Sequence, residues 1–141
     1  MRKGFKEKFK RLGISIVHLF GSRITGGSNK LSDMDIGVVL KDLPSSGDTR
    51  VLYNALYKIF SELYSDSKID IVFLQTAPLS LQYSIIKDGK VLFEEDPILT
   101  ADYEYRVVNQ YLDFRPVLDF FDSVVIKRYS KTFGKTQNHS K

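Results

Sequence analysis

The sequence contains no cysteine and only two histidines among its 141 residues. Without cysteine there can be no disulfide, thiolate metal site or cysteine nucleophile, so stability must come from packing and chemistry from other groups. His18 lies in an apolar run, where we expect a structural histidine with its hydrogen bonds satisfied, and His139 lies near the end of the chain. We therefore expect neither a histidine metal site nor a Ser-His-Asp triad.

Long hydrophobic runs are also missing. No segment is apolar enough to cross a bilayer, and residues 1–6 are charged, without the hydrophobic region of a signal peptide. We expect a soluble cytoplasmic protein that does not bind membranes. The length and the 43% apolar content suit a single domain with an ordinary core. We predict that this domain spans residues 1–130 and that residues 131–141, which lack periodicity, form a disordered tail.

Positive charge is concentrated at the two ends of the chain. Residues 1–12 carry six Lys/Arg and one Glu, and residues 127–141 carry five Lys/Arg and no acid. The ends therefore sum to +10, and because the whole chain carries +4, the residues between them carry −6. A basic groove for a polynucleotide is normally built into the folded body, so this distribution argues against direct nucleic-acid binding.

Helical and strand patterns alternate along the chain. Apolar residues at helical spacing predict helices over 5–12, 51–63 and 78–87, and the C-terminal region reads as a long helix that Pro116 interrupts or restarts. Asp48 and Asp96 are the expected N-caps of two of these helices. β-branched and apolar runs predict strands over 14–20, 34–40, 69–74 and 90–93. This alternation predicts an α/β (α+β) fold with a small sheet of about four strands flanked by helices and a C-terminal helical segment.

Three acidic residues stand out beside the predicted strands. Asp33 and Asp35 are separated by one residue, so on a strand they project from the same side about 7 Å apart. Asp70 opens a later apolar run that should lie beside theirs in the sheet, within reach of a shared metal. Mg²⁺ prefers a few carboxylates together with phosphate oxygens and water, and it would relieve the repulsion between such acids. The pattern predicts two-metal phosphoryl or nucleotidyl transfer.

A glycine-serine pair precedes the acids at the end of the first predicted strand. Gly21 lets the backbone approach a ligand closely, and the Ser22 hydroxyl can contact phosphates of a bound triphosphate. Arg23 either adds a charge-assisted phosphate contact or pairs with one of the acids. Ten residues separate Ser22 from Asp33.

Gly21, Ser22, Asp33, Asp35 and Asp70 match the motif of a known family. The sequence resembles the minimal nucleotidyltransferases of the DNA polymerase β-like superfamily, and it looks particularly like the antitoxins that pair with HEPN-domain toxins. The resemblance implies a nucleotidyltransferase fold with a mixed sheet, two Mg²⁺ ions held by the three acids, and ATP as substrate. It further implies transfer of AMP to a tyrosine of a HEPN toxin within a hetero-oligomer.

Two other functions are compatible with the sequence. A small-molecule nucleotidyltransferase of the antibiotic-modifying type would share the motif, but such enzymes usually need a further helical domain or a dimer to enclose the acceptor. A binding module that only occludes its partner is the second alternative. It would have no reason to keep three costly carboxylates together. The last helices carry Tyr103, Tyr111, Phe114, Phe120 and Phe121, which we expect mainly to cover the domain's own sheet. A partner surface is the alternative for part of this set.

Overall fold

One mixed sheet of four strands organises the molecule, in the spatial order β3-β2-β1-β4. The computed structural model describes residues 3–21, 34–65 and 67–137. The strands are β1 (Ile14–Phe20), β2 (Met34–Leu40), β3 (Ile69–Phe73) and β4 (Lys90–Glu94). β1 pairs antiparallel with both β2 and β4, whereas β2 and β3 run parallel. The predicted mixed sheet of about four strands is confirmed.

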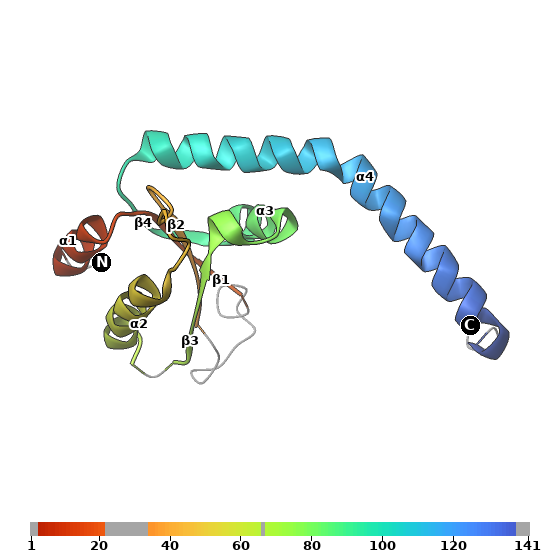
Figure 1. The fold of residues 1–141 in the computed structure, drawn as a ribbon, viewed down its shortest axis with the longest axis horizontal. Helices are drawn as coiled ribbons and strands as arrows, with labels where there is room; N and C mark the ends of the chain where they lie inside the picture. The colour runs from red at the N-terminus through yellow and green to blue at the C-terminus, as the bar shows by residue number, and fades with distance from the viewer. Residues whose placement is uncertain (1–2, 22–33, 66, 138–141) are drawn as a thin grey trace.

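Helices cover both faces of this sheet (Figure 1). On one face, α1 (Lys3–Arg11) and α2 (Arg50–Leu63) pack over the strands. The Phe9 ring lies 5.4 Å from that of Phe60 and 5.2 Å from that of Phe93, which joins both helices to β4. Phe9 and Phe60 are completely buried. Their spacing within α1 and α2 places them on the sheet-facing side of each helix, which is why these amphipathic segments fold here.

The opposite face is covered by α3 (Leu79–Asp88) and by the first part of α4 (Pro97–Gln137). A short 3₁₀ turn, η1 (Leu74–Thr76), connects β3 to α3. The second core cluster consists of Ile16, Val39, Leu74, Ile85, Tyr103 and Val107. Among the described residues, no helix is long and apolar enough to span a membrane.

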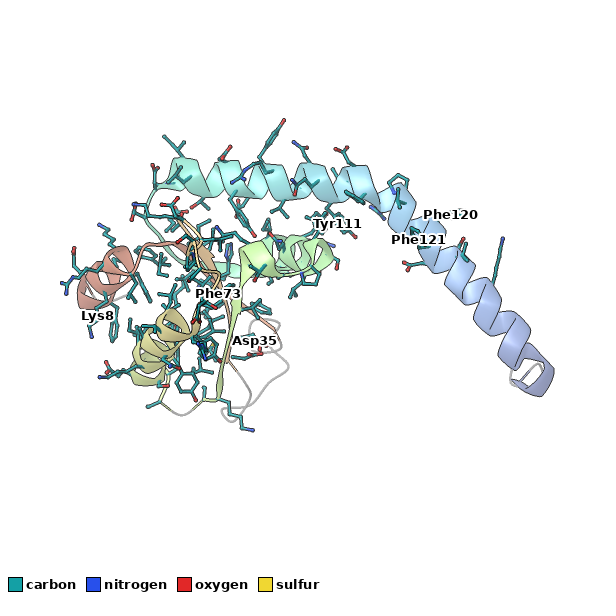
Figure 2. All side chains as sticks on the ribbon, in the orientation of Figure 1. Lys8, Asp35, Phe73, Tyr111, Phe120 and Phe121 are labelled. Carbon is teal, nitrogen blue, oxygen red and sulfur yellow. The ribbon has the colours of Figure 1, made fainter. Side chains whose placement is uncertain are left out.

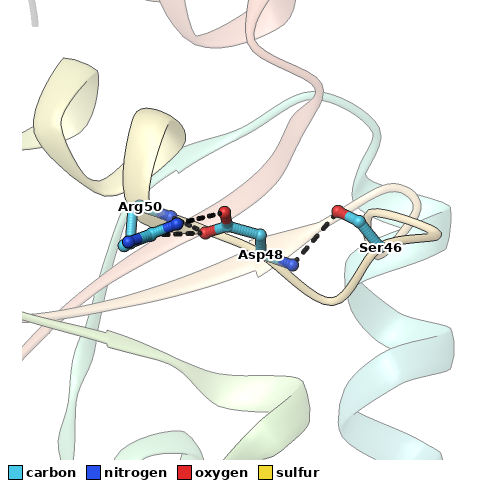
Figure 3. A network of polar contacts seen from close by, with 3 residues as sticks. All are labelled: Ser46, Asp48 and Arg50. Carbon is cyan, nitrogen blue, oxygen red and sulfur yellow. Dashed lines mark hydrogen bonds and ion pairs between the residues drawn. The ribbon is translucent and has the colours of Figure 1, made fainter.

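The two predicted helix N-caps have different outcomes. Asp96 accepts a hydrogen bond from the Ile98 N–H at 2.9 Å just before α4 begins at Pro97, so this N-cap is confirmed. The N-cap of α2 is Thr49, and the prediction of Asp48 was wrong. Asp48 lies one residue earlier, where its carboxylate accepts hydrogen bonds from the backbone and guanidinium of Arg50 (Figure 3). The Asp48 N–H in turn donates to the Ser46 hydroxyl.

α4 is a single helix that bends near its middle and extends beyond the sheet (Figure 1). The predicted interruption at Pro116 does not occur, because the helix continues through this residue. Proline removes one backbone hydrogen bond and crowds the preceding turn, which accounts for a bend without a break. The helix reaches Gln137, so the predicted domain boundary after residue 130 falls within it. The division into a domain and a disordered tail stays a prediction.

Candidate active site

Asp35 and Asp70 are direct register partners in the parallel strands β2 and β3. Their neighbours Ile36 and Ile71 are buried in the cluster under α1 and α2, and because side chains alternate along a strand, both aspartates point to the opposite face. Neighbouring strands are about 4.8 Å apart, so the two side chains start from adjacent positions. Asp35 is half-buried and Asp70 is exposed. The predicted position of the Asp70 strand beside that of Asp35 is confirmed.

Gly21 brings the backbone against the carboxylate of Asp35. Phe20 is the register partner of Asp35 in the antiparallel β1–β2 pair, and Gly21 follows it directly with a φ of 91°. A Cβ atom on Gly21 would overlap Oδ2 of Asp35. Glycine is therefore required here both by its backbone conformation and by the lack of space. The sequence indicated that Gly21 allows a close approach, but its contact with the aspartate could not be read from the motif.

Part of the predicted site lies outside the described residues, namely Ser22, Arg23 and Asp33. Among the residues that the structure does describe, no group of three or more His, Cys, Asp or Glu could hold a metal ion. The three-acid metal site therefore stays a prediction. The two described acids fit its chemistry, since Asp35 and Asp70 offer hard oxygen ligands from one sheet face, as Mg²⁺ prefers.

His18 lies on the same sheet face as Asp35, two residues before Phe20, and sequence analysis misjudged it. Its side chain is buried, yet neither ring nitrogen has a hydrogen-bond partner among the described residues. The expectation of a satisfied structural histidine was wrong, because the nearby carboxylate of Glu104 is too far from Nε2 for a hydrogen bond. Burial lowers the pKa of His18 to about 4, although the negative charge of Glu94 acts in the opposite direction. Nε2 lies 3.9 Å from Oε2 of Glu104 in α4.

A cavity of about 530 Å³ lies at the other end of β2, under the first turns of α4. Leu40 lines this cavity and lies five residues along the strand from Asp35, a distance of about 16 Å. Gln75 closes the sheet edge there: its amide accepts from the Leu40 N–H at 2.8 Å and donates to the Leu40 carbonyl at 2.7 Å. The cavity is therefore separate from the paired acids and is not the place of their chemistry.

A mixed four-stranded sheet between two helical layers, with acids paired at the start of two parallel strands, is the fold of nucleotidyltransferases. The family profile described as "Polymerase beta, Nucleotidyltransferase" matches residues 3–98, and the chain belongs to this family. The match extends from α1 to the start of α4 and contains every residue of the predicted site. The nucleotidyltransferase fold inferred from the Gly-Ser and acidic motif is thereby confirmed.

Solved structures with the same fold agree with this assignment. The chain resembles a chain of the "toxin-antitoxin with AMP-PNP" with a TM-score of 0.65 and 24% identity, over 85% of this chain and 98% of that one. It also resembles a chain of the "tri-AMPylated Shewanella oneidensis HEPN toxin in complex with MNT antitoxin" with a TM-score of 0.60 and 22% identity, over 89% and 99%. The expected resemblance to HEPN/MNT pairs is confirmed. None of the curated proteins compared with the chain matches it.

Proposed function

We propose that this protein is a Mg²⁺-dependent enzyme that transfers AMP from ATP to a tyrosine of a HEPN toxin and thereby acts as its antitoxin. The observation that carries the proposal is the in-register pair of Asp35 and Asp70 on one sheet face, in a chain that belongs to the nucleotidyltransferase family. Support for the nucleotide and the partner comes from relatives of the same fold, one described with AMP-PNP and one with a tri-AMPylated HEPN toxin.

The proposed roles of the residues follow from the motif in the sequence. Asp33, Asp35 and Asp70 would hold the metal, while Gly21, Ser22 and Arg23 would contact the triphosphate. Bound Mg²⁺ would supply positive charge to the phosphate oxygens and to the leaving group. Asp70 is the more exposed of the two described acids, so it is placed to receive a proton from an acceptor that arrives from solvent.

The reaction exchanges one phosphorus–oxygen bond for another. The tyrosine oxygen forms a bond to the α-phosphorus of ATP, the bond from this phosphorus to the bridging oxygen breaks, and pyrophosphate leaves. The phenolic proton passes to the Asp70 carboxylate. Docking a folded partner holds the hydroxyl in line with the α-phosphate and makes the reaction effectively intramolecular. The added AMP brings negative charge to the toxin, which would repel the phosphate backbone of RNA.

The test is to incubate the protein with ATP, Mg²⁺ and a HEPN toxin encoded in the same genome, and to record the intact mass of the toxin. We expect an increase by whole AMP units that is lost in Asp33→Ala and in Asp35→Asn, while both variants remain folded. As a control, Glu62→Gln removes an exposed carboxylate on α2 and should leave transfer unchanged. If Asp33→Ala silences the toxin as well as the wild type does, and the mass of the toxin does not change, the protein is an occluding module.

A small-molecule nucleotidyltransferase is the remaining alternative, and the same preparation tests it. Transfer of AMP to an antibiotic in the absence of any toxin, with no mass shift of the toxin when it is present, would favour that function.

A further inference from the structure

The middle of α4 carries large apolar side chains that the domain does not cover (Figure 2). Phe114, Phe120 and Phe121 were expected mainly to cover the domain's own sheet, and for these three residues the expectation was wrong. The exposed residues are Leu112 (49%), Phe114 (55%), Val117 (45%), Phe120 (64%) and Phe121 (59%). We call residues 112–121 the α4 arm. The arm lies entirely beyond residues 3–98, which match the family profile.

The apolar side of the arm lies on the same side of α4 that packs on the sheet. Val107, Phe114 and Phe121 are spaced by seven residues, so they lie on nearly the same side of the helix. Val107 is buried in the core cluster beneath α4, whereas Phe114 and Phe121 are more than half exposed. Between them, Tyr111 stacks on Tyr83 of α3 with ring centroids 4.0 Å apart. The domain thus covers this face as far as Tyr111, and the same face then continues without cover.

A face of this size is comparable to the largest apolar patch of a typical monomer, and such patches are often functional. Leu112 lies on the other side of the helix, but Phe114, Val117, Phe120 and Phe121 lie within about 120° of one another. These four present roughly 400 Å² of apolar surface, since one large side chain exposes on the order of 200 Å² in full. Contiguous patches on monomeric proteins rarely exceed a few hundred Å², and the larger ones mark interaction sites. A helical segment without tertiary contacts is also only marginally stable in water. Both arguments indicate that the arm is completed by another protein.

Area and charge together disfavour a second copy of this chain. Two arms packed on each other through this face would bury roughly 800 Å² in total, below the ~1,200–2,000 Å² of stable protein interfaces. The arm and the residue after it carry Asp113, Asp119 and Asp122 but only one basic residue, Arg115, so two copies would bring like charges together. A folded partner with an apolar surface and a basic rim avoids both problems. It can extend the buried area beyond the arm, and its basic side chains would attract the acidic ones.

We propose that the α4 arm is the docking surface for the toxin that carries the acceptor tyrosine, which rests on the proposed function. The toxin would present an apolar surface to Phe114 and Phe121, rimmed by basic side chains that face the acidic residues Asp113, Asp119 and Asp122. Figure 2 shows Phe120 and Phe121 on the same side of the body as Asp35, and Lys8 of α1 at the opposite side. A partner held by the arm therefore lies on the side of the domain where the paired acids are found.

The test uses the double variant Phe114→Asp/Phe121→Asp in the full chain with a HEPN toxin from the same genome. We expect toxin binding, measured by calorimetry, to weaken at least about 100-fold, because each buried aromatic anchor contributes strongly to an interface. Binding of ATP with Mg²⁺ should remain as in the wild type. The matched control is Val51→Asp/Ile98→Asp, which changes two apolar residues that are 83% and 76% exposed outside the arm. This control should bind the toxin like the wild type.

Three results would overturn the docking proposal. One is unchanged toxin binding by the arm variant, and another is a wild-type chain that binds no HEPN toxin. The third is a wild-type dimer in sedimentation analysis that the arm variant dissociates, since it would make a second copy the occupant. The proposed function fails separately: if the wild type binds the toxin through the arm but adds no AMP to it, the docking surface stands and the transfer reaction does not.

Discussion

Gly21 and Asp35 lie so close together that a single methyl group on the glycine would overlap a carboxylate oxygen of the aspartate. The two residues come from different strands, and the pairing of Phe20 with Asp35 sets their separation. Gly21 also has a positive φ of 91°, which L side chains rarely adopt. Gly21 therefore helps to position Asp35, in addition to its expected role of allowing the backbone to approach phosphate.

Replacing Gly21 by alanine should displace the Asp35 carboxylate and reduce AMP transfer by about 100-fold, as small misplacements of reacting groups do. The folded state should also lose about 1–2 kcal/mol through backbone strain. The matched control is Gly13→Ala, because Gly13 has a similar φ of 75° but nothing within 4 Å of an added Cβ. This control should show the loss of stability in thermal unfolding and retain transfer. Equal activity of the two variants would contradict a role for the Gly21–Asp35 contact.

Replacing Asp70 by asparagine should separate binding from chemistry. The exposed position of Asp70 favours a role at the acceptor hydroxyl, so Asp70→Asn should lower the rate of transfer by about 10²–10⁴-fold and keep much of the ATP affinity. Calorimetric titration with ATP and Mg²⁺ gives the affinity, and single-turnover kinetics gives the rate. Asp102→Asn, at an exposed acid that pairs with Arg106 on α4, is the control. A variant that loses ATP affinity but transfers normally once saturated would show that Asp70 grips the triphosphate instead.

The buried His18 should make the protein less stable in mild acid. Burial lowers the pKa of His18 to about 4, below its value of 6.5 when unfolded, so the unfolded chain binds the proton more readily between these pH values. The stability that neutral His18 contributes is complete above pH 6.5 and is lost as the pH falls towards 4, on the order of 3 kcal/mol in all. Urea unfolding at pH 7 and pH 5 measures this loss.

The variant His18→Leu tests the assignment of that pH dependence. Burial, together with the charge of Glu94, raises the pKa of Glu104. The contribution of this carboxyl to the stability of the folded protein therefore increases as the pH falls, which opposes the effect of His18. Without His18, the free energy of unfolding should therefore stay the same or increase as the pH falls from 7 to 5. His139→Leu changes the only other histidine and should retain the wild-type dependence. The same acid sensitivity in His18→Leu would refute the assignment.

Gln75 should contribute to stability through the backbone of Leu40. Its amide satisfies both the N–H and the carbonyl of Leu40, as a neighbouring strand would. Gln75→Leu leaves both groups without this partner, which should cost about 1–3 kcal/mol. The control Gln110→Leu changes an exposed glutamine on α4. Urea unfolding gives the free energy of unfolding of both variants. Equal values would show that water replaces the Gln75 amide at this edge.

The strands and the paired acids were largely predictable from the sequence. Ile14–Phe20 and Met34–Leu40 have the predicted bounds, because β-branched and apolar residues between turn signals favour buried strands. The position of Asp70 beside Asp35 also followed from the pattern, since each acid is the second residue of a strand in the same sheet. Strand direction was not readable, because apolar composition is similar in parallel and antiparallel strands when both faces are buried.

Other features depend on tertiary contacts that the sequence does not encode locally. Helical spacing shows that Phe114 and Phe121 share a face with Val107, but it cannot show where the domain's own cover ends. Asp48 and Thr49 are both common N-cap residues, so the residue type did not identify which one caps α2. The unpartnered nitrogens of His18 depend on which groups surround them in the folded protein.

The parallel pairing of β2 with β3 has a consequence for the order of folding. Thirteen residues, 21–33, separate β1 from β2, whereas 28 residues, 41–68, which include α2, separate β2 from β3 and so Asp35 from Asp70. Contacts between residues distant in the chain form slowly, because the entropy of closing a long loop must be overcome first. The two acids therefore come together late, after β1 and β2 have paired. The proposed transfer of AMP would depend on the complete long-range topology.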